Sequence, residues 1–253
     1  MKLLYTNFHS GSGGGHTTYI RELARGLSER HDVHVAAPED SRLLREARGI
    51  PGLHAFAQTY PNGLRLRPAR RRACARLRAY LEEHRFDIVH VNGSADHRLV
   101  IAALRGLQPR PLVVLTKHNT KPMRGLQHVW RARAGTDKVI AVCEFVRHQL
   151  SHTPYRRCRP ETVYNGVDTA FYSPAEPADR VDARQLWIGS NAGTADYKGW
   201  TDLVEALALL TPDERGRIQV VIAGHPPSAA QREMLARSGL QDRFHFPGLL
   251  DDV

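Results

Sequence analysis

The chain has 253 residues, of which 42% are hydrophobic and 25% are charged, proportions typical of a globular protein. These values disfavour a disordered chain, a collagen or a coiled coil, and no stretch approaches the ~20 apolar residues of a membrane-spanning helix. The three cysteines cannot all pair, and no C-x-x-C spacing is present. We therefore expect a reduced, cytoplasmic compartment and no metal held by cysteines.

The net charge of +10 is unevenly distributed along the chain. Residues 1–170 contain 28 Lys and Arg against 14 Asp and Glu, whereas residues 171–253 contain 8 against 12. The positive field of the first part would attract a phosphorylated ligand or an anionic membrane surface. No zinc, RNP or helix-turn-helix motif accompanies this charge, so nucleic acid is not a predicted partner.

Strands and helices are predicted to alternate through the first part of the chain. Apolar and β-branched runs predict the strands, and the spacing of Ile20, Leu23, Ala24 and Leu27 predicts the first helix. Alternation of this kind indicates a parallel sheet with helices on both faces. The predicted strands cover residues 2–8, 33–37, 88–91, 112–116, 138–142 and 162–164, and further helices cover 69–84, 96–107, 124–134 and 144–151.

A second α/β pattern begins after a turn region at 168–177. Its strands are predicted at 186–189, 218–223 and 244–246, with helices at 200–210 and 228–238. These elements make half of a doubly wound domain, and the acidic pair 251–252 is typical of a further helix start. We therefore expect two Rossmann-like domains, residues 1–170 and an incomplete 171–253, in a fragment of a longer protein.

Two sequence features at predicted strand ends suggest anion binding. The run Gly13-Gly14-Gly15 separates the first strand from the first helix, where backbone N–H groups favour a phosphate. A flexible turn is the alternative. Lys198 follows the first strand of the second part and could neutralise a diphosphate, although a lysine at a helix start is often only a surface residue.

Three further residues at strand ends are candidates for contact with a substrate. His118 follows the strand 112–116, and a neutral imidazole there could orient a sugar oxygen. Asp96 and His97 follow the strand 88–91 and could meet an acceptor. Most of the 14 histidines must nonetheless be solvated or structural.

Residues 61–80 contain seven arginines and no acid, with apolar residues interleaved. This pattern predicts a basic helix at a membrane surface, with Arg70, Arg71 and Arg72 at its centre. A solvated basic face is an equal alternative.

Several motifs, taken in order, resemble the retaining glycosyltransferases of family 4. The most specific is the N-G-V-D sequence at 165–168, which an aromatic residue and a proline follow. The others are the glycine run, FDIVHVNG at 86–93, His118, KVIAVCEFVRHQL at 138–150, YKGWTDLVEALALL at 197–210, VVIAG at 220–224 and FHFPGLLDDV at 244–253.

This resemblance implies the GT-B fold, an α/β architecture of two Rossmann-like domains. It implies that Gly14 and Gly15 approach the diphosphate of a nucleotide-sugar donor, that Lys198 balances its charge, and that Asn191 contributes to the donor site. His118 would lie near the transferred sugar and the acceptor. The resemblance implies neither a metal nor a cofactor, because protein dipoles and cations stabilise the leaving group.

The sequences most resembled are bacterial enzymes that build lipopolysaccharide core or other envelope glycans. With the positive first domain, this favours a glycolipid or lipid-linked glycan acceptor at the inner face of the cytoplasmic membrane. Two features depart from the family pattern. The arginine that usually precedes the lysine is absent from 189–196, and the E-x7-E motif would fall beyond Val253.

These departures imply that this stretch alone is inactive. Two alternatives remain open: a GT-B sugar-nucleotide epimerase, and a truncated module that only binds a nucleotide sugar.

Overall fold

The computed structural model describes residues 1–11, 13–173 and 185–250. The chain divides into two compact units, Met1–Tyr172 and Ser173–Val253, each of which is considered by itself. The predicted turn region at 168–177 extends outside the described residues, and the acidic pair predicted to begin another helix lies wholly outside them.

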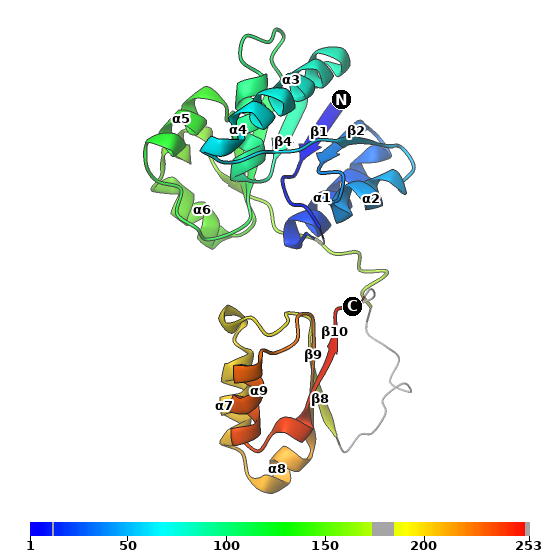
Figure 1. The fold of residues 1–253 in the computed structure, drawn as a ribbon, viewed down its shortest axis with the longest axis vertical. Helices are drawn as coiled ribbons and strands as arrows, with labels where there is room; N and C mark the ends of the chain where they lie inside the picture. The colour runs from blue at the N-terminus through cyan, green and yellow to red at the C-terminus, as the bar shows by residue number, and fades with distance from the viewer. Residues whose placement is uncertain (12, 174–184, 251–253) are drawn as a thin grey trace. The chain divides into compact units, whose positions relative to one another are not determined.

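Unit 1 is built on a seven-stranded parallel sheet with the order β3-β2-β1-β4-β5-β6-β7 (Figure 1). Strands β2 and β3 follow β1 on one side of the sheet, and strands β4 to β7 follow it on the other side. The direction of winding therefore reverses between β1 and β4, where α/β proteins commonly bind ligands. The strands are β1 Lys2–Thr6, β2 Asp32–Ala37, β3 Leu53–Ala57, β4 Ile88–Val91, β5 Leu112–Lys117, β6 Lys138–Ala141 and β7 Glu161–Thr162.

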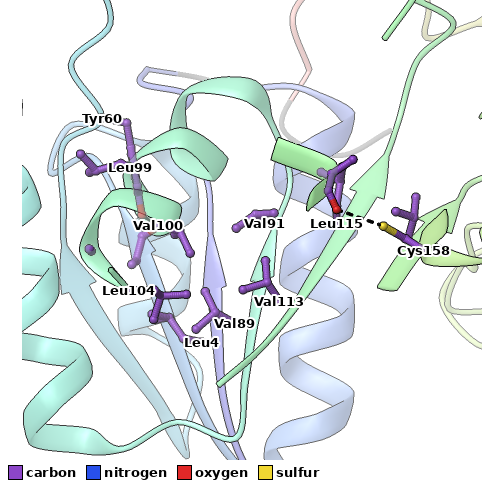
Figure 2. Packing of buried hydrophobic residues seen from close by; sticks show 14 of the residues in the cluster. Leu4, Tyr60, Val89, Val91, Leu99, Val100, Leu104, Val113, Leu115 and Cys158 are labelled. Carbon is purple, nitrogen blue, oxygen red and sulfur yellow. Dashed lines mark hydrogen bonds between the residues drawn. The ribbon is translucent and has the colours of Figure 1, made fainter. Parts of the chain in front are cut away.

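Helices cover both faces of this sheet, as the predicted alternation requires. Alternate residues of a strand point to opposite faces, so Leu3 and Leu4 enter two different cores. The core with Leu3 includes α1 and α2, and the core with Leu4 includes α3, α4, α5 and α6. Figure 2 shows side chains of α4 beside those of β1, β4 and β5 in the second core. The helices are α1 Gly15–Ser28, α2 Arg42–Arg48, α3 Arg67–His84, α4 Ser94–Ala103, α5 Leu126–Ala134 and α6 Glu144–Ser151, with 3₁₀ turns at Leu64–Leu66 and Pro154–Cys158.

The apolar stripe of α3 faces the protein. Ala73, Leu77 and Leu81 are spaced four residues apart, and all three are buried in the core with Leu4. These side chains cannot also enter a lipid surface, so the expectation of a membrane helix with its own apolar side is wrong. What α3 exposes is its arginine side.

Unit 2 has a three-stranded parallel sheet with the order β10-β9-β8. One face packs against α7 and α9, which contribute to one core with the sheet (Figure 1). Trp200, Val204 and Leu235 come from these helices and meet Val220 and Phe244 of the sheet. The elements are β8 Leu186–Ser190, α7 Trp200–Ala208, α8 Pro212–Gly216, β9 Ile218–Ala223, α9 Ala229–Arg237 and β10 Phe244–Gly248, with 3₁₀ turns at Asp196–Lys198 and Gln241–Arg243.

Candidate functional site

The candidate site of unit 1 lies at the carboxyl ends of β1, β4 and β5, which are neighbours in the sheet. His118 follows β5, Asn92 follows β4, and His16 stands in the first turn of α1, directly after the glycine run. The imidazoles of His16 and His118 have centroids 4.1 Å apart. The fold thus brings His118 next to the helix start that Gly14 and Gly15 form.

Hydrogen bonds of Asn92 determine which nitrogen of His118 carries a proton. The Asn92 Nδ2 donates to the carbonyl oxygens of Thr6 (3.2 Å) and His90 (3.3 Å). This orientation turns Asn92 Oδ1, an acceptor only, toward His118 Nε2 at 2.9 Å. His118 Nε2 must therefore donate, and in the neutral ring Nδ1 is left as an acceptor for a hydroxyl group.

The surroundings of His118 keep its ring neutral. Burial, and to a smaller extent the neighbouring His16, His90, His9 and Lys117, lowers its pKa to about 3. Burial also lowers the pKa of His16 to about 4, helped by His9 and Lys117. At neutral pH this edge of the sheet presents uncharged imidazoles, which can exchange hydrogen bonds with a sugar without carrying charge.

A second group of buried side chains supports the ring of His118. The Tyr19 ring meets the His118 ring edge-on at 4.7 Å between centroids. The Tyr19 hydroxyl lies 3.3 Å from Thr116 Oγ1, and His90 Nε2 lies 2.6 Å from the same Thr116 Oγ1. Because β1, β4, β5 and α1 all contribute, the position of the imidazole is fixed by the fold.

Within the glycine run, Gly13 is the position that requires a glycine. Its φ is +69°, and a Cβ there would lie 2.1 Å from Thr17 Oγ1. Gly14 is extended and precedes α1, and a Cβ added at Gly14 or Gly15 would meet no atom within 4 Å. Both residues are exposed at a helix start, so their predicted approach to a diphosphate is sterically open.

Asp96 and His97 are placed differently from the prediction. Neither has exposed surface. The Asp96 carboxylate accepts hydrogen bonds from Thr6 Oγ1 (2.9 Å) and from the N–H groups of Asn92 (2.8 Å) and Gly93 (3.2 Å). His97 Nε2 lies 3.0 Å from the Gly135 carbonyl oxygen. Asp96 therefore caps α4 and anchors the loop that carries Asn92, and neither side chain can touch an acceptor in this conformation.

Arg70, Arg71 and Arg72 are exposed on α3. Arg70 also borders a cavity of about 440 Å³ that Asn62, Arg98 and Trp130 help to line. No acidic residue is among those that line this cavity. This part of unit 1 offers guanidinium groups to an anion.

The candidate site of unit 2 is the loop between β8 and α7. Lys198 is exposed, and its Nζ lies 5.1 Å from the centroid of the Tyr197 ring. Asn191 is also exposed, seven positions earlier. Both predicted donor-binding residues therefore lie on one loop with their side chains accessible.

Hydrogen bonds and close backbone packing hold this loop. Trp200 Nε1 donates to the Thr194 carbonyl oxygen at 2.9 Å, and Gln231 Nε2 donates to the same oxygen at 2.9 Å. The backbones of Gly193 and Gly224 are so close that a Cβ at Gly224 would lie 2.8 Å from the Gly193 Cα. The loop that carries Lys198 is thereby held against the end of β9.

Sequence reasoning missed His16, Tyr19, His90 and Asn92. His90 and Asn92 come at the end of β4, and His16 directly follows the glycine run. These three positions lie at a strand end or a helix start, and position at a strand end is also what singled out His118. Tyr19 lies within α1 and has no such signal. The contacts between the four residues depend on strand order, which the sequence does not state.

The two parallel sheets and their helices define an α/β protein of the glycosyltransferase GT-B class, and solved structures agree. The chain is similar to HepE (Alr3699) of Anabaena in complex with UDP and glucose, at 18% identity and a TM-score of 0.75 over 100% of this chain and 70% of that chain. WaaB, a lipopolysaccharide outer core galactosyltransferase, is 15% identical with a TM-score of 0.66, over 99% and 69%. WaaG, a glycosyltransferase involved in lipopolysaccharide biosynthesis, is 15% identical with a TM-score of 0.67, over 99% and 70%.

Residues 13–171 match the family model of Glycosyltransferase Family 4, which is more than half of the chain, and the chain therefore belongs to this family. A comparison with curated proteins finds no match. Among the described residues, no helix is both long and apolar enough to cross a membrane.

Proposed function

We propose that this protein transfers a sugar from a nucleotide-sugar donor, with retention of configuration, to an anionic glycan acceptor of the cell envelope. The observation that carries the proposal is the neutral His118, held by Asn92 beside the start of α1. Family membership supports a glycosyltransferase, and the complex of HepE with UDP and glucose supports a nucleotide-sugar donor.

Each proposed donor contact follows from an exposed backbone or side-chain group. The first N–H groups of a helix lack intrahelical acceptors and attract anions, so Gly14 and Gly15 would receive the diphosphate. Lys198 would add an ammonium group, and Asn191 an amide, from the loop after β8. Donor binding through these groups would require no metal ion or organic cofactor.

His118 is the proposed catalytic residue together with Lys198. The imidazole Nδ1 would accept a hydrogen bond from a hydroxyl of the transferred sugar or the acceptor and hold it in position for transfer. Lys198 would stabilise the negative charge that develops on the leaving nucleoside diphosphate. The attacking oxygen would enter from the face that the diphosphate leaves, which accounts for retention without a protein nucleophile.

The exposed arginines of α3 support the proposed acceptor. Arg70, Arg71 and Arg72 would attract phosphate groups of a glycolipid or the anionic inner face of the cytoplasmic membrane. The known roles of WaaB and WaaG in lipopolysaccharide synthesis also favour an envelope acceptor. In this proposal the protein works in the cytoplasm and associates peripherally with the membrane.

Release of UDP tests the proposal. The full-length protein is incubated with UDP-glucose, with and without detergent-solubilised core lipopolysaccharide, and UDP is measured. We expect release only when both are present, and a loss of about 100-fold or more in kcat/KM for His118→Ala and for Lys198→Ala. His152→Ala, an exposed histidine of unit 1, is the control and should retain full turnover.

The same assay separates the alternatives. Conversion of the sugar nucleotide without an acceptor would indicate an epimerase. Binding of UDP-glucose by calorimetry with no turnover under any condition would indicate a binding module. Turnover that both variants retain would contradict the proposed site.

A further inference from the structure

Two histidines and an aspartate converge at the amino ends of β2 and β3. Asp32 and His34 are two residues apart on β2, so their side chains share one face of the sheet. His54 of β3 is the register partner of His34 and lies beside it on that face. Strand geometry alone therefore gathers three metal-ligating side chains, at the edge opposite to the one that carries His118.

The distances between the ligand atoms suit a metal ion. Asp32 Oδ1 lies 2.9 Å from His34 Nε2 and 3.5 Å from His54 Nε2. One ligand atom from each residue lies within 4.8 Å of the others, and this is the one such group found among the described residues. Tetrahedral zinc with bonds of about 2.0–2.1 Å places its ligand atoms roughly 3.3 Å apart, so small movements would complete the site.

The surroundings of the three residues fix two ligands and leave the third adjustable. The side chain of His34 is 3% exposed, and its Nδ1 lies 2.6 Å from the Tyr80 hydroxyl. A hydroxyl can accept as well as donate, so Nδ1 can carry the proton while Nε2 offers a lone pair to a metal. Lys2 Nζ contacts Asp32 Oδ2 at 2.9 Å, which leaves Oδ1 available.

His54 supplies the freedom that the site needs. Its side chain is 61% exposed, and its ring is stacked on that of His34 at 4.5 Å between centroids. In stacked rings the nitrogen lone pairs do not converge fully on one point. Rotation of the exposed ring, which meets little resistance, would bring its Nε2 onto the metal.

We propose that Asp32, His34 and His54 bind one divalent transition-metal ion of the zinc class, through two imidazole nitrogens and one carboxylate oxygen. A solvent molecule would occupy the fourth position. The ion would join β3, the edge strand of the sheet, to β2. Its role would be structural, because the site lies at the amino edge of the sheet and the proposed transfer site at the carboxyl edge.

Cobalt absorption and zinc competition test this inference. The full chain, freed of metal with EDTA and dialysed, is titrated with Co²⁺, and the visible absorption is recorded. We expect one Co²⁺ per chain with the intense bands of four-coordinate cobalt, displaced by Zn²⁺. His54→Ala should weaken Zn²⁺ binding at least tenfold, and Asp32→Asn should do so as well. His54 is exposed, so this variant should fold normally, which circular dichroism checks.

A competing histidine pair provides the matched control. His148 and His152 are four residues apart at the end of α6, with ring centroids 5.0 Å apart, and such a pair can also hold a metal. The double variant His148→Ala/His152→Ala should retain the cobalt spectrum and affinity. If the double variant loses binding while His54→Ala keeps it, or if no stoichiometric binding occurs, the inference is overturned.

The supporting tyrosine supplies a second readout. Tyr80→Phe removes the partner of His34 Nδ1 without removing a ligand, and we expect zinc affinity to fall by about tenfold. Sugar transfer should be indifferent to EDTA, whereas the melting temperature should rise with Zn²⁺ in the unaltered protein and not in His54→Ala. A melting temperature that Zn²⁺ raises equally in both would also contradict the site.

Discussion

The amide of Asn92 determines which ring nitrogen carries the proton in neutral His118, the central residue of the candidate site. Two backbone carbonyls hold its Nδ2, and its oxygen receives the His118 Nε2–H. We predict that the His118 imidazole does not titrate between pH 5 and 8, because its pKa lies near 3. The measurement is the NMR shift of its ring proton as a function of pH.

A matched substitution makes this prediction sharper. Asn92→Asp keeps the size of the side chain and places a carboxylate next to His118 Nε2, which should raise the pKa of the imidazole. A His118 that titrates near 6.5 in the unaltered protein, or does not respond to Asn92→Asp, would contradict the assignment.

Adjacent glycines of the 13–15 run should respond differently to alanine. Gly13→Ala must accommodate a Cβ at φ +69° against the buried Thr17 side chain, and we expect it to lose about 1–3 kcal/mol of unfolding free energy. Gly14→Ala has free space, so its unfolding free energy should change by less than about 0.5 kcal/mol. Urea unfolding compares the two variants, and equal losses would show that the turn geometry is described incorrectly.

Several histidines on different elements are buried or half-buried in a neutral form, and this couples stability to pH. Burial lowers the pKa of His90, His97 and His16 to about 4. The unfolded chain binds protons on these groups below about 6.5, whereas the folded chain does not until about pH 4. The folded state is therefore favoured above pH 6.5, and its stability should decline steadily as the pH falls from 6.5 to 4.

Urea midpoints at several pH values measure this decline. His90→Gln can retain a hydrogen bond to Thr116 and cannot titrate, so its midpoint should depend less on pH than that of the unaltered protein. If the urea midpoint of the unaltered protein does not change between pH 6.5 and 4, protonation of the buried rings does not destabilise the folded state, and the prediction is wrong.

The exposed arginines of helix α3 are predicted to bind an anionic membrane surface. Its apolar stripe is buried, so attraction to a membrane can come only from its arginines and must be sensitive to salt. The triple variant Arg70→Ala/Arg71→Ala/Arg72→Ala should lose most of its binding to phosphatidylglycerol vesicles at about 0.1 M salt. Co-sedimentation with the vesicles measures the fraction of protein bound.

A triple variant with equal charge is the control for α3. Arg156, Arg157 and Arg159 are exposed in and next to the 3₁₀ turn Pro154–Cys158. Their replacement by alanine removes the same charge from another surface. If both triple variants lose binding equally, net charge and not α3 governs the attraction. If neither loses it, the arginines of α3 do not bind the membrane.

On the scale of the whole molecule, the alternation of apolar strands and amphipathic helices was sufficient to predict the α/β class. The same pattern did not predict the elements α2, β3 and α8. α2 has seven residues and α8 has five, too few for a clear helical period. The strand Leu53–Ala57 contains two alanines and a histidine and lies at the sheet edge, so its composition is weakly strand-like.

The candidate site was predictable only in part, for a related reason. Position after a strand identified His118 and Lys198, because parallel strands share one carboxyl edge. It could not distinguish Asp96, which turns inward to cap α4, from a residue that faces solvent. Asp96 is the third residue of α4 and accepts from the N–H of the N-cap Gly93, as the acidic residue of a capping box does, and this position near a helix start was the available signal.

The indole of Trp200 gives unit 2 a built-in optical probe. Of the three tryptophans, Trp130 and Trp187 are about half exposed, whereas Trp200 is 5% exposed and donates to the loop that ends at Lys198. Its emission should be blue-shifted relative to the other two. The indole N–H of Trp200 donates to a carbonyl oxygen of that loop, so a change in tryptophan emission upon addition of UDP would report a rearrangement of the loop without any attached dye.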